Sequence, residues 1–122
     1  MGYRSDMKAL IYPVSGADSL MKYEQLKTLM NTTFKDFYDY WEDPHLVWDD
    51  KHRVLLFSIE GVKWYELYPE VVAFNRFLTE VHDLGYVWES IRLGENDDDV
   101  ECLASDGAEW YLSVRREIEV NL

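Results

Sequence analysis

One stretch of the chain decides its fold: residues 69–85 read PEVVAFNRFLTEVHDLG. Apolar residues recur in it at spacings of three and four, the period of an α-helix with one buried face: Val71, Phe74, Leu78 and Val81. Proline suits the first position of a helix, and Gly85 suits the residue that follows its last turn. The stretch therefore predicts a helix over residues 69–84.

Strand patterns lie on both sides of this helix. Residues 53–60 are apolar on both faces, which suits a central strand, and Gly61 is expected to bend or interrupt it. After the helix, residues 86–93 and 100–104 are predicted to be strands. Residues 109–120 alternate apolar and polar side chains, as a strand with one wet face does, so they are predicted to form one further strand.

The first half of the chain adds one more helix. Residues 8–12 read as a strand that ends at a proline. A helix is predicted from Asp18, its N-cap, to about residue 35, with a second piece reaching 41. Residues 46–48 are predicted to be a short strand that enters a turn.

This order, β-α-β-β-α-β-β-β, predicts a largely antiparallel twisted sheet of about five to six strands with two helices packed on one face. A chain of 122 residues fits one domain, so residues 1–122 are predicted to form a single α+β domain. Its 48% of hydrophobic residues can supply a core. The formal net charge of -12 argues against direct binding to nucleic acid or to an anionic membrane.

Two segments without Lys or Arg carry this charge, and the rest of the chain is close to neutral. Residues 36–50 hold acids among aromatic residues: Asp36, Asp39, Glu42, Asp43, Asp49 and Asp50, with Trp41 and Trp48. Residues 95–109 hold a second set: Glu95, Asp97, Asp98, Asp99, Glu101, Asp106 and Glu109.

Two interpretations of the segments stay open. Acidic loops can simply keep a small domain soluble. They can also dock on a basic groove and imitate nucleic-acid phosphates, with aromatic anchors among the charges. The second interpretation predicts partner contacts from all the acids of residues 36–50 and from Glu95, Asp97, Asp98 and Asp99, with Trp41 and Trp48 as anchors.

Catalytic and metal-binding patterns are weak. Residues 95–99 lack the glycine and distal glutamate of a calcium loop, and His45 and His52 flank Asp49 and Asp50 without a known zinc spacing. No nucleophile or nucleotide motif is present, so we expect no enzyme activity, no metal and no cofactor. Cys102, the single cysteine, is expected to be a buried, inert thiol of a reducing cytoplasm.

The chain begins Gly2-Tyr3-Arg4-Ser5-Asp6 and continues with Val62-Lys63-Trp64-Tyr65, Tyr68-Pro69-Glu70-Val71 and Ile91-Arg92-Leu93-Gly94-Glu95. In these landmarks it resembles small uncharacterised proteins of bacteriophages and prophages. The resemblance implies a phage origin and action in the cytoplasm of a bacterial host, as anti-CRISPR and anti-restriction factors act. It assigns no functional residue. A local ion pair between Arg4 and Asp6 is expected to pin the N-terminus.

The sequence therefore predicts a non-enzymatic acidic binding protein that blocks a basic, nucleic-acid-binding surface of a bacterial protein or nucleoprotein complex. Two alternatives remain: a self-associating module that buries exposed aromatic residues in a homodimer, and a metal-dependent enzyme built on His45 and His52.

Overall fold

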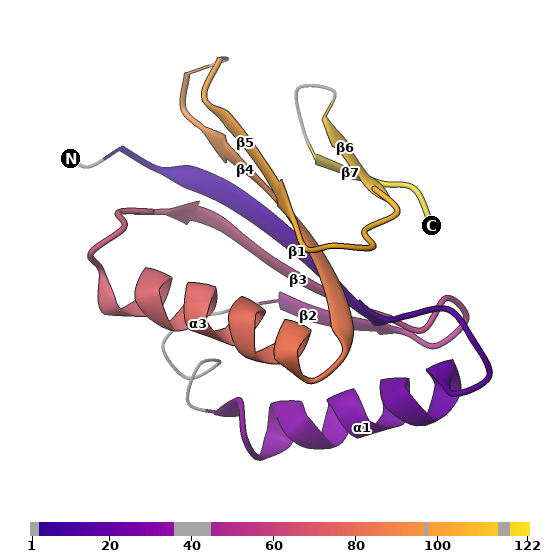
Figure 1. Ribbon diagram of the computed structural model, residues 1–122. Helices are drawn as coiled ribbons and strands as arrows, with labels where there is room; N and C mark the ends of the chain where they lie inside the picture. Colours follow the sequence, from indigo (N-terminus) through magenta and orange to yellow (C-terminus); the bar gives the residue numbers. More distant parts are fainter. Residues whose placement is uncertain (1–2, 36–44, 97, 115–117) are drawn as a thin grey trace.

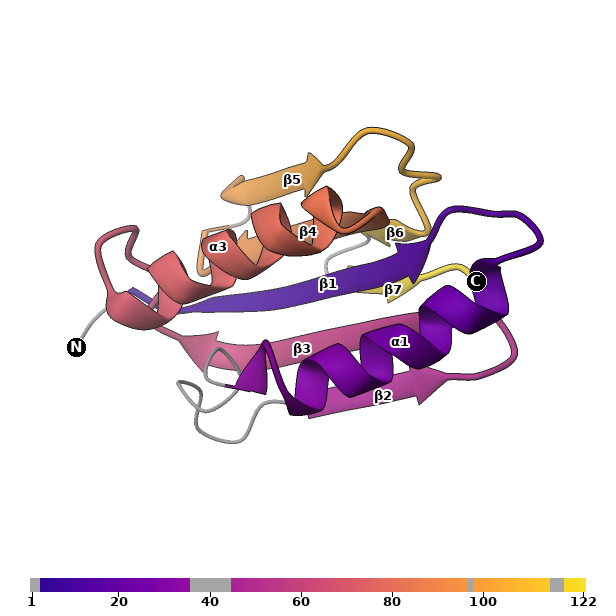
Figure 2. The same cartoon turned by 60° about the horizontal axis from the view of Figure 1, so that its bottom comes forward.

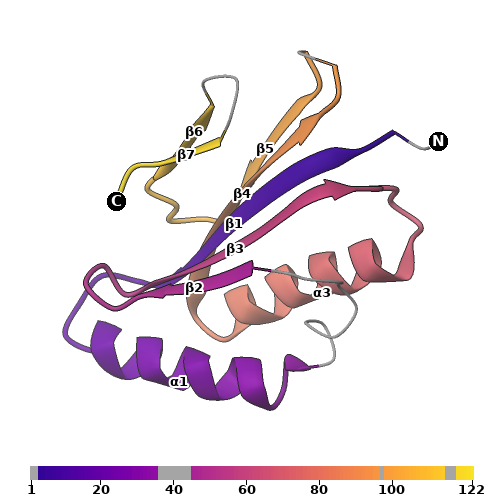
Figure 3. The same cartoon turned by 180° about the vertical axis from the view of Figure 1, so that it is seen from behind.

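The computed structural model describes residues 3–35, 45–96, 98–114 and 118–122 (Figure 1). A five-stranded antiparallel sheet has the order β2-β3-β1-β4-β5. Its strands are β1 (Ser5–Pro13), β2 (His45–Asp49), β3 (Val54–Val62), β4 (Tyr86–Gly94) and β5 (Val100–Ala104). Helices α1 (Ser19–Asn31) and α3 (Pro69–Asp83) cover one face, and the two-stranded hairpin of β6 (Leu112–Val114) and β7 (Ile118–Val120) lies on the other (Figure 3). The predicted α+β class is confirmed.

Helix α3 confirms the prediction made from residues 69–84. Pro69 occupies its start, and the N–H of Leu84 closes its last turn on the carbonyl of Glu80. Gly85 then adopts a φ of +95°, which a residue with a side chain rarely does, and the chain turns into β4. The predicted apolar positions, joined by Phe77, are buried: Val71, Phe74, Phe77, Leu78 and Val81.

Helix α1 is shorter than predicted, because it ends at Asn31 before a run of two threonines, which are weak helix formers. It buries Tyr23, Leu26 and Met30, while Leu20 and Met21 at its start stay exposed. The predicted extension to residue 41 lies outside the described residues. Among those that are described, no helix has the length and apolar character needed to cross a membrane.

Strand β1 lies at the centre of the sheet and is buried on both faces. Met7, Ala9 and Ile11 point into a core between the sheet and the helices. Leu10 and Tyr12 point into a second core between the sheet and the β6–β7 hairpin. The sheet therefore separates two apolar layers.

The single strand predicted over residues 109–120 is wrong. The chain reverses there, so that Leu112 pairs with Val120 and Val114 with Ile118. The alternation does identify the buried face, since Leu112 and Ile118 both lie in the second core. Residues 114–118 contain no Gly, Pro, Asn or Asp, so no turn signal marks the reversal.

The prediction of a buried Cys102 is also wrong, because the cysteine is exposed. It lies on β5, which forms an edge of the sheet. Figure 2 shows β5 beyond α3, outside the layer that the two helices form. A strand pattern alone does not tell an edge strand from a central one.

Candidate functional site

Asp49 and Asp50 lie where β2 turns into β3, and both carboxylates have partners there. Asp50 accepts hydrogen bonds from the Tyr23 hydroxyl, at 2.6 Å, and from the Lys27 ammonium, at 3.0 Å, both on α1. These two donors lower the pKa of the Asp50 carboxyl. Asp49 accepts a hydrogen bond from the backbone N–H of His52 through one carboxylate oxygen, and the His52 ring nitrogen lies 2.9 Å from the other oxygen. These contacts with His52 lower the pKa of the Asp49 carboxyl. Both acids therefore stabilise the turn.

Trp48 also faces α1. Its ring is half-buried, packs edge-on against Tyr23 at 5.8 Å between centroids, and lies 5.8 Å from the Lys27 nitrogen. These contacts make Trp48 part of the packing between β2 and α1. The predicted contact residues Asp36, Asp39, Trp41, Glu42, Asp43 and Asp97 lie outside the described residues.

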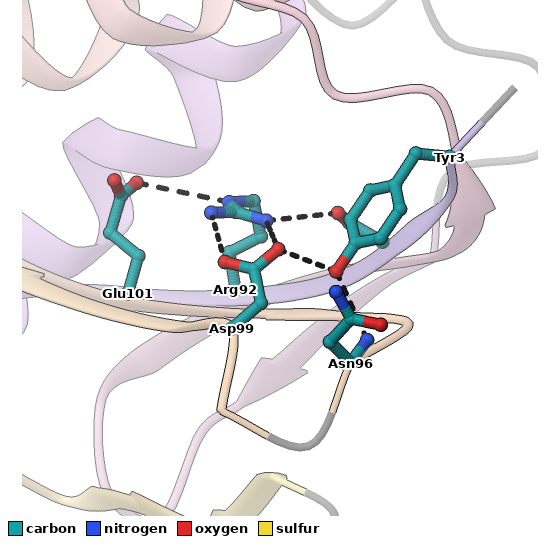
Figure 4. Close-up of polar contacts among 6 residues, drawn as sticks. Tyr3, Arg92, Asn96, Asp99 and Glu101 are labelled. Carbon is teal, nitrogen blue, oxygen red and sulfur yellow. Dashed lines mark hydrogen bonds and ion pairs between the residues drawn. The ribbon is translucent and has the colours of Figure 1, made fainter.

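A polar network fixes the other acidic segment to the start of the chain (Figure 4). The Tyr3 hydroxyl donates to Asp99 Oδ2 at 2.7 Å and accepts the N–H of Asn96 at 3.0 Å. The Arg92 guanidinium donates hydrogen bonds to both oxygens of the Asp99 carboxylate, at 3.0 and 3.2 Å, and a third to the Ser5 hydroxyl. The network therefore joins β1 to the tip of the β4–β5 hairpin.

Gly94 leaves the space for this network. A Cβ on Gly94 would overlap the Asp99 carboxylate and the Tyr3 hydroxyl, although the φ of Gly94 is not in the left-handed region. The hydrogen bonds from Arg92, followed by that from Tyr3, lower the pKa of the Asp99 carboxyl. Asp99 is thus a structural carboxylate with a cation bound to it.

The expected ion pair between Arg4 and Asp6 is wrong, because both side chains bind the backbone of Gly61 instead. Arg4 Nη1 donates to the Gly61 carbonyl at 2.6 Å, and the Gly61 N–H donates to Asp6 at 2.8 Å. Gly61 has a φ of +64°, and the pairing of β1 with β3 shifts register here. The two side chains satisfy the polar groups that this bulge leaves unpaired in the ladder.

These contacts gather acidic and apolar side chains at one end of the sheet. The Tyr3 N–H donates to the Tyr65 hydroxyl, and the Arg4 N–H donates to Glu95, so three separate segments meet there. Figure 1 shows the chain start, the β3–α3 loop and the β4–β5 tip at this end. We call this surface the acidic rim, and its residues are Tyr3, Asp6, Glu60, Tyr65, Glu66, Leu67, Tyr68, Glu95, Asp98 and Asp99.

Exposed apolar area distinguishes the acidic rim from an ordinary charged loop. Leu67 is 91% exposed, and Tyr65 and Tyr68, which pack edge-on against each other, are each 38% exposed. Glu66 and Asp98 are exposed and form no ion pair or side-chain hydrogen bond with any described residue. The acidic rim therefore combines an exposed apolar side chain with at least two acids, Glu66 and Asp98, that no described cation neutralises.

Sequence reasoning found Glu95, Asp98 and Asp99 but missed the apolar part of the acidic rim. The available signal was the run Trp64-Tyr65-Glu66-Leu67-Tyr68 directly before the proline that starts α3. Large apolar residues in a loop fit neither a helical nor a strand period, and a loop exposes what it carries. Only Trp64 of this run packs against the core.

Asp49 and Asp50 lie at the opposite end of the sheet from Glu95, Asp98 and Asp99, whereas Asp106 and Glu109, which follow β5, lie at the same end as Asp49 and Asp50. Ile11, near the end of β1, is paired with Leu55, next to the turn that holds Asp50. Ser5, at its start, is paired with Gly94, next to Asp99. The nine residues of β1 separate these ends by roughly 25–30 Å. Asp49 and Asp50 therefore do not extend the acidic rim.

One further carboxylate, on Glu89, is fully buried under the β6–β7 hairpin. It accepts the Tyr12 hydroxyl at 2.8 Å and the backbone N–H groups of Trp110 and Leu112 at 3.0 and 2.7 Å. Its oxygens are aimed at these donors, which attach the C-terminal segment to the sheet. Burial and three donors assign Glu89 a structural role.

No group of three or more metal-ligating side chains occurs within the described parts of the chain. Comparison with models of known protein families, with curated proteins and with solved structures finds no match. The site must therefore be judged by its own geometry.

Proposed function

We propose that this chain is a non-enzymatic acidic binding protein whose acidic rim docks on a basic, nucleic-acid-binding surface of a bacterial protein or nucleoprotein complex. One observation carries the proposal: Leu67, 91% exposed, lies with Tyr65 and Tyr68 in the β3–α3 loop beside the exposed acid Glu66, at the end of the sheet that also holds Glu60 and Asp98.

Each part of this surface has a physical role in binding. Carboxylates without bound cations attract a basic partner over distance and speed its association, although salt weakens this attraction. Aromatic and apolar side chains at the centre lose water on contact and supply affinity, while polar groups around them set the orientation. Asp49, Asp50 and Trp48 contribute little in this arrangement, because α1 and His52 already bind them.

The narrower proposal, an inhibitor of a host defence system, rests on the resemblance to phage proteins. A phage protein that presents carboxylates where nucleic-acid phosphates would bind can block a defence complex without catalysis. A nucleic-acid competitor should therefore displace it, and this property can be measured.

The test compares two triple variants that change the net charge equally. The rim variant carries Glu60→Lys, Glu66→Lys and Asp98→Lys. The control variant carries three reversals at exposed acids away from the acidic rim: Glu80→Lys, Asp83→Lys and Asp106→Lys. Each immobilised protein is incubated with bacterial lysate at low and high salt, with and without duplex DNA, and retained proteins are identified by mass spectrometry.

We expect a basic nucleic-acid-binding protein to be retained by the wild type and the control variant, lost from the rim variant, and released by salt or by DNA. Equal loss from both triple variants would indicate a response to net charge alone and would contradict a rim site. Retention that DNA leaves unchanged would contradict competition with nucleic acid.

A further inference from the structure

Strand β5 ends the sheet with an open outer edge. It pairs with β4 on one side, and no described strand lies on its other side. Natural edge strands are usually protected by lysine, proline, a bulge or a covering segment. The sequence of β5, VECLA, contains neither lysine nor proline, and its ladder with β4 runs in register without a bulge.

The register with β4 determines which backbone groups of β5 face outward. The N–H of Ser105 donates to the carbonyl of Trp88, and the N–H of Gly94 donates to the carbonyl of Asp99. Hydrogen-bonded pairs alternate along an antiparallel ladder, so the odd-numbered residues of this segment point toward β4. The N–H and C=O groups of Cys102 and Ala104 therefore point away from the sheet.

Apolar side chains of β5 are also uncovered on both faces of the sheet. Leu103 is 47% exposed on the helix side of the sheet, because it is paired with Ser90 of β4, two residues from Trp88, which packs against the core under the helices. Val100, 40% exposed, and Cys102 lie on the opposite face, because they are paired with Leu93 and Ile91 of β4, which pack toward the hairpin. An added strand would bury apolar area on both faces at once.

We propose that β5 binds the β5 strand of a second copy of this chain, so that two sheets join into one continuous sheet across a two-fold axis at Cys102. This interface meets the acidic rim only at Asp98 and Asp99, which directly precede β5, and it does not depend on the function proposed for the rim. The argument for a second copy, rather than an unrelated peptide, is that pairing β5 with itself about this axis joins its outward backbone groups without opposing two charged side chains of β5.

That register pairs Cys102 with Cys102 of the second copy and Val100 with Ala104. It gives every residue of β5 a partner, sets the N–H and C=O groups of Cys102 opposite those of its copy and lets the Ala104 N–H donate to the Val100 carbonyl, while the Val100 N–H already donates to the Asp98 carbonyl of its own chain. It also sets Glu101 opposite Leu103. A shift of the two-fold axis to residue 101 would instead oppose two glutamates directly, which is unfavourable.

The test measures mass by sedimentation equilibrium at near-millimolar protein and about 1 M salt, where repulsion between the acidic chains is screened to within about 3 Å. The wild type should have twice the 14.5 kDa mass of one chain. Ala104→Pro removes an N–H that points outward, and Cys102→Lys opposes two cations at the axis. Both variants should be monomeric with unchanged circular dichroism. Thr79→Lys adds the same single positive charge as Cys102→Lys, but on the exposed surface of α3, and should leave the dimer intact.

Oxidation supplies a second readout of the register. With copper phenanthroline and dioxygen as oxidant, two Cys102 thiols would lose two electrons and two protons to form one disulfide. Opposed residues of a hydrogen-bonded pair lie about 5.5 Å apart at Cα, within disulfide range. We expect rapid cross-linking of the wild type and little for Ala104→Pro.

A wild-type mass of 14.5 kDa under these conditions would overturn the proposal, as would a dimer that persists in both edge variants. The rim triple variant should still dimerise, so failure of the acidic rim and failure of the β5 interface give different results.

Discussion

Asp98 and Asp99 are neighbours in the chain, yet their carboxylates have different surroundings. Asp99 forms an ion pair with Arg92 and accepts a hydrogen bond from the Tyr3 hydroxyl, while Asp98 is exposed and forms no ion pair with a described residue. Asp50 resembles Asp99 in this respect, because Lys27 of α1 neutralises it. Which acids can contact a partner is therefore decided residue by residue, by the cations that the fold brings to them.

Replacing Asp99 by Asn should make the stability of the protein less dependent on acid pH. The pKa of Asp99 is lowered in the folded state from its ordinary value of 3.8, so its ionised form stabilises the fold. That contribution is complete above pH 3.8 and is lost as the pH falls below it. Urea unfolding of the wild type and D99N, measured at several pH values, should show D99N less stable at neutral pH, with a difference that narrows below pH 3.8. A difference that does not change with pH would contradict this role of the Arg92 pair.

Trp48 and Leu67 should respond in opposite ways to truncation. Trp48→Ala removes a half-buried ring packed against Tyr23, so we expect a loss of about 2 kcal/mol, less than the roughly 3–5 kcal/mol of a fully buried ring. Leu67→Ala should change the free energy of unfolding by less than about 0.5 kcal/mol, because Leu67 is 91% exposed. Chemical denaturation measures both. In the capture assay Leu67→Ala should weaken retention of the partner, and folded Trp48→Ala should retain it.

At the scale of elements, α3 could be predicted from the sequence, because its start, its period and its stop are all local signals. The hairpin of β6 and β7 could not, since alternation identifies the buried face but not the direction of the chain. The edge position of β5 could not be predicted from the sequence either, because strand order depends on contacts between segments far apart in the chain. The same limit applies to the acidic rim, where Tyr3 and Tyr65 meet from separate segments.

Glu89 should hold the β6–β7 hairpin on the sheet. Glu89→Gln replaces one acceptor oxygen by an amide donor, which leaves a backbone N–H of Trp110 or Leu112 without its acceptor in a buried site. We expect a loss of about 1–3 kcal/mol. Hydrogen exchange should accelerate at Leu112 and its neighbours and remain slow at Val81 in α3. Glu101→Gln, at an exposed position of β5, serves as the matched control and should have little effect.

For the whole molecule, the sequence correctly located the charge in two segments but could not show how they lie relative to each other. Asp49 and Asp50 lie at the opposite end of β1 from Glu95, Asp98 and Asp99, and the second of these ends also presents Leu67, Tyr65 and Tyr68. At the other end, Lys27 pairs with Asp50 and His52 pairs with Asp49. The two ends of the sheet are therefore different surfaces, and the open edge of β5 is a third.

Salt should act with opposite sign on the two proposed interactions. Each chain carries a net charge of -12, so two copies repel each other, and in the β5 register Asp98 comes near Asp106 of the second copy. Raising the salt concentration from about 0.1 M to about 1 M shortens the screening length from about 10 Å to about 3 Å and should increase the dimer fraction. The same change removes attraction between the acidic rim and a basic partner and should decrease capture. Sedimentation and capture measured on one preparation across this range therefore separate the two interactions. A dimer that dissociates as salt rises would indicate attraction between unlike charges and would contradict pairing through β5.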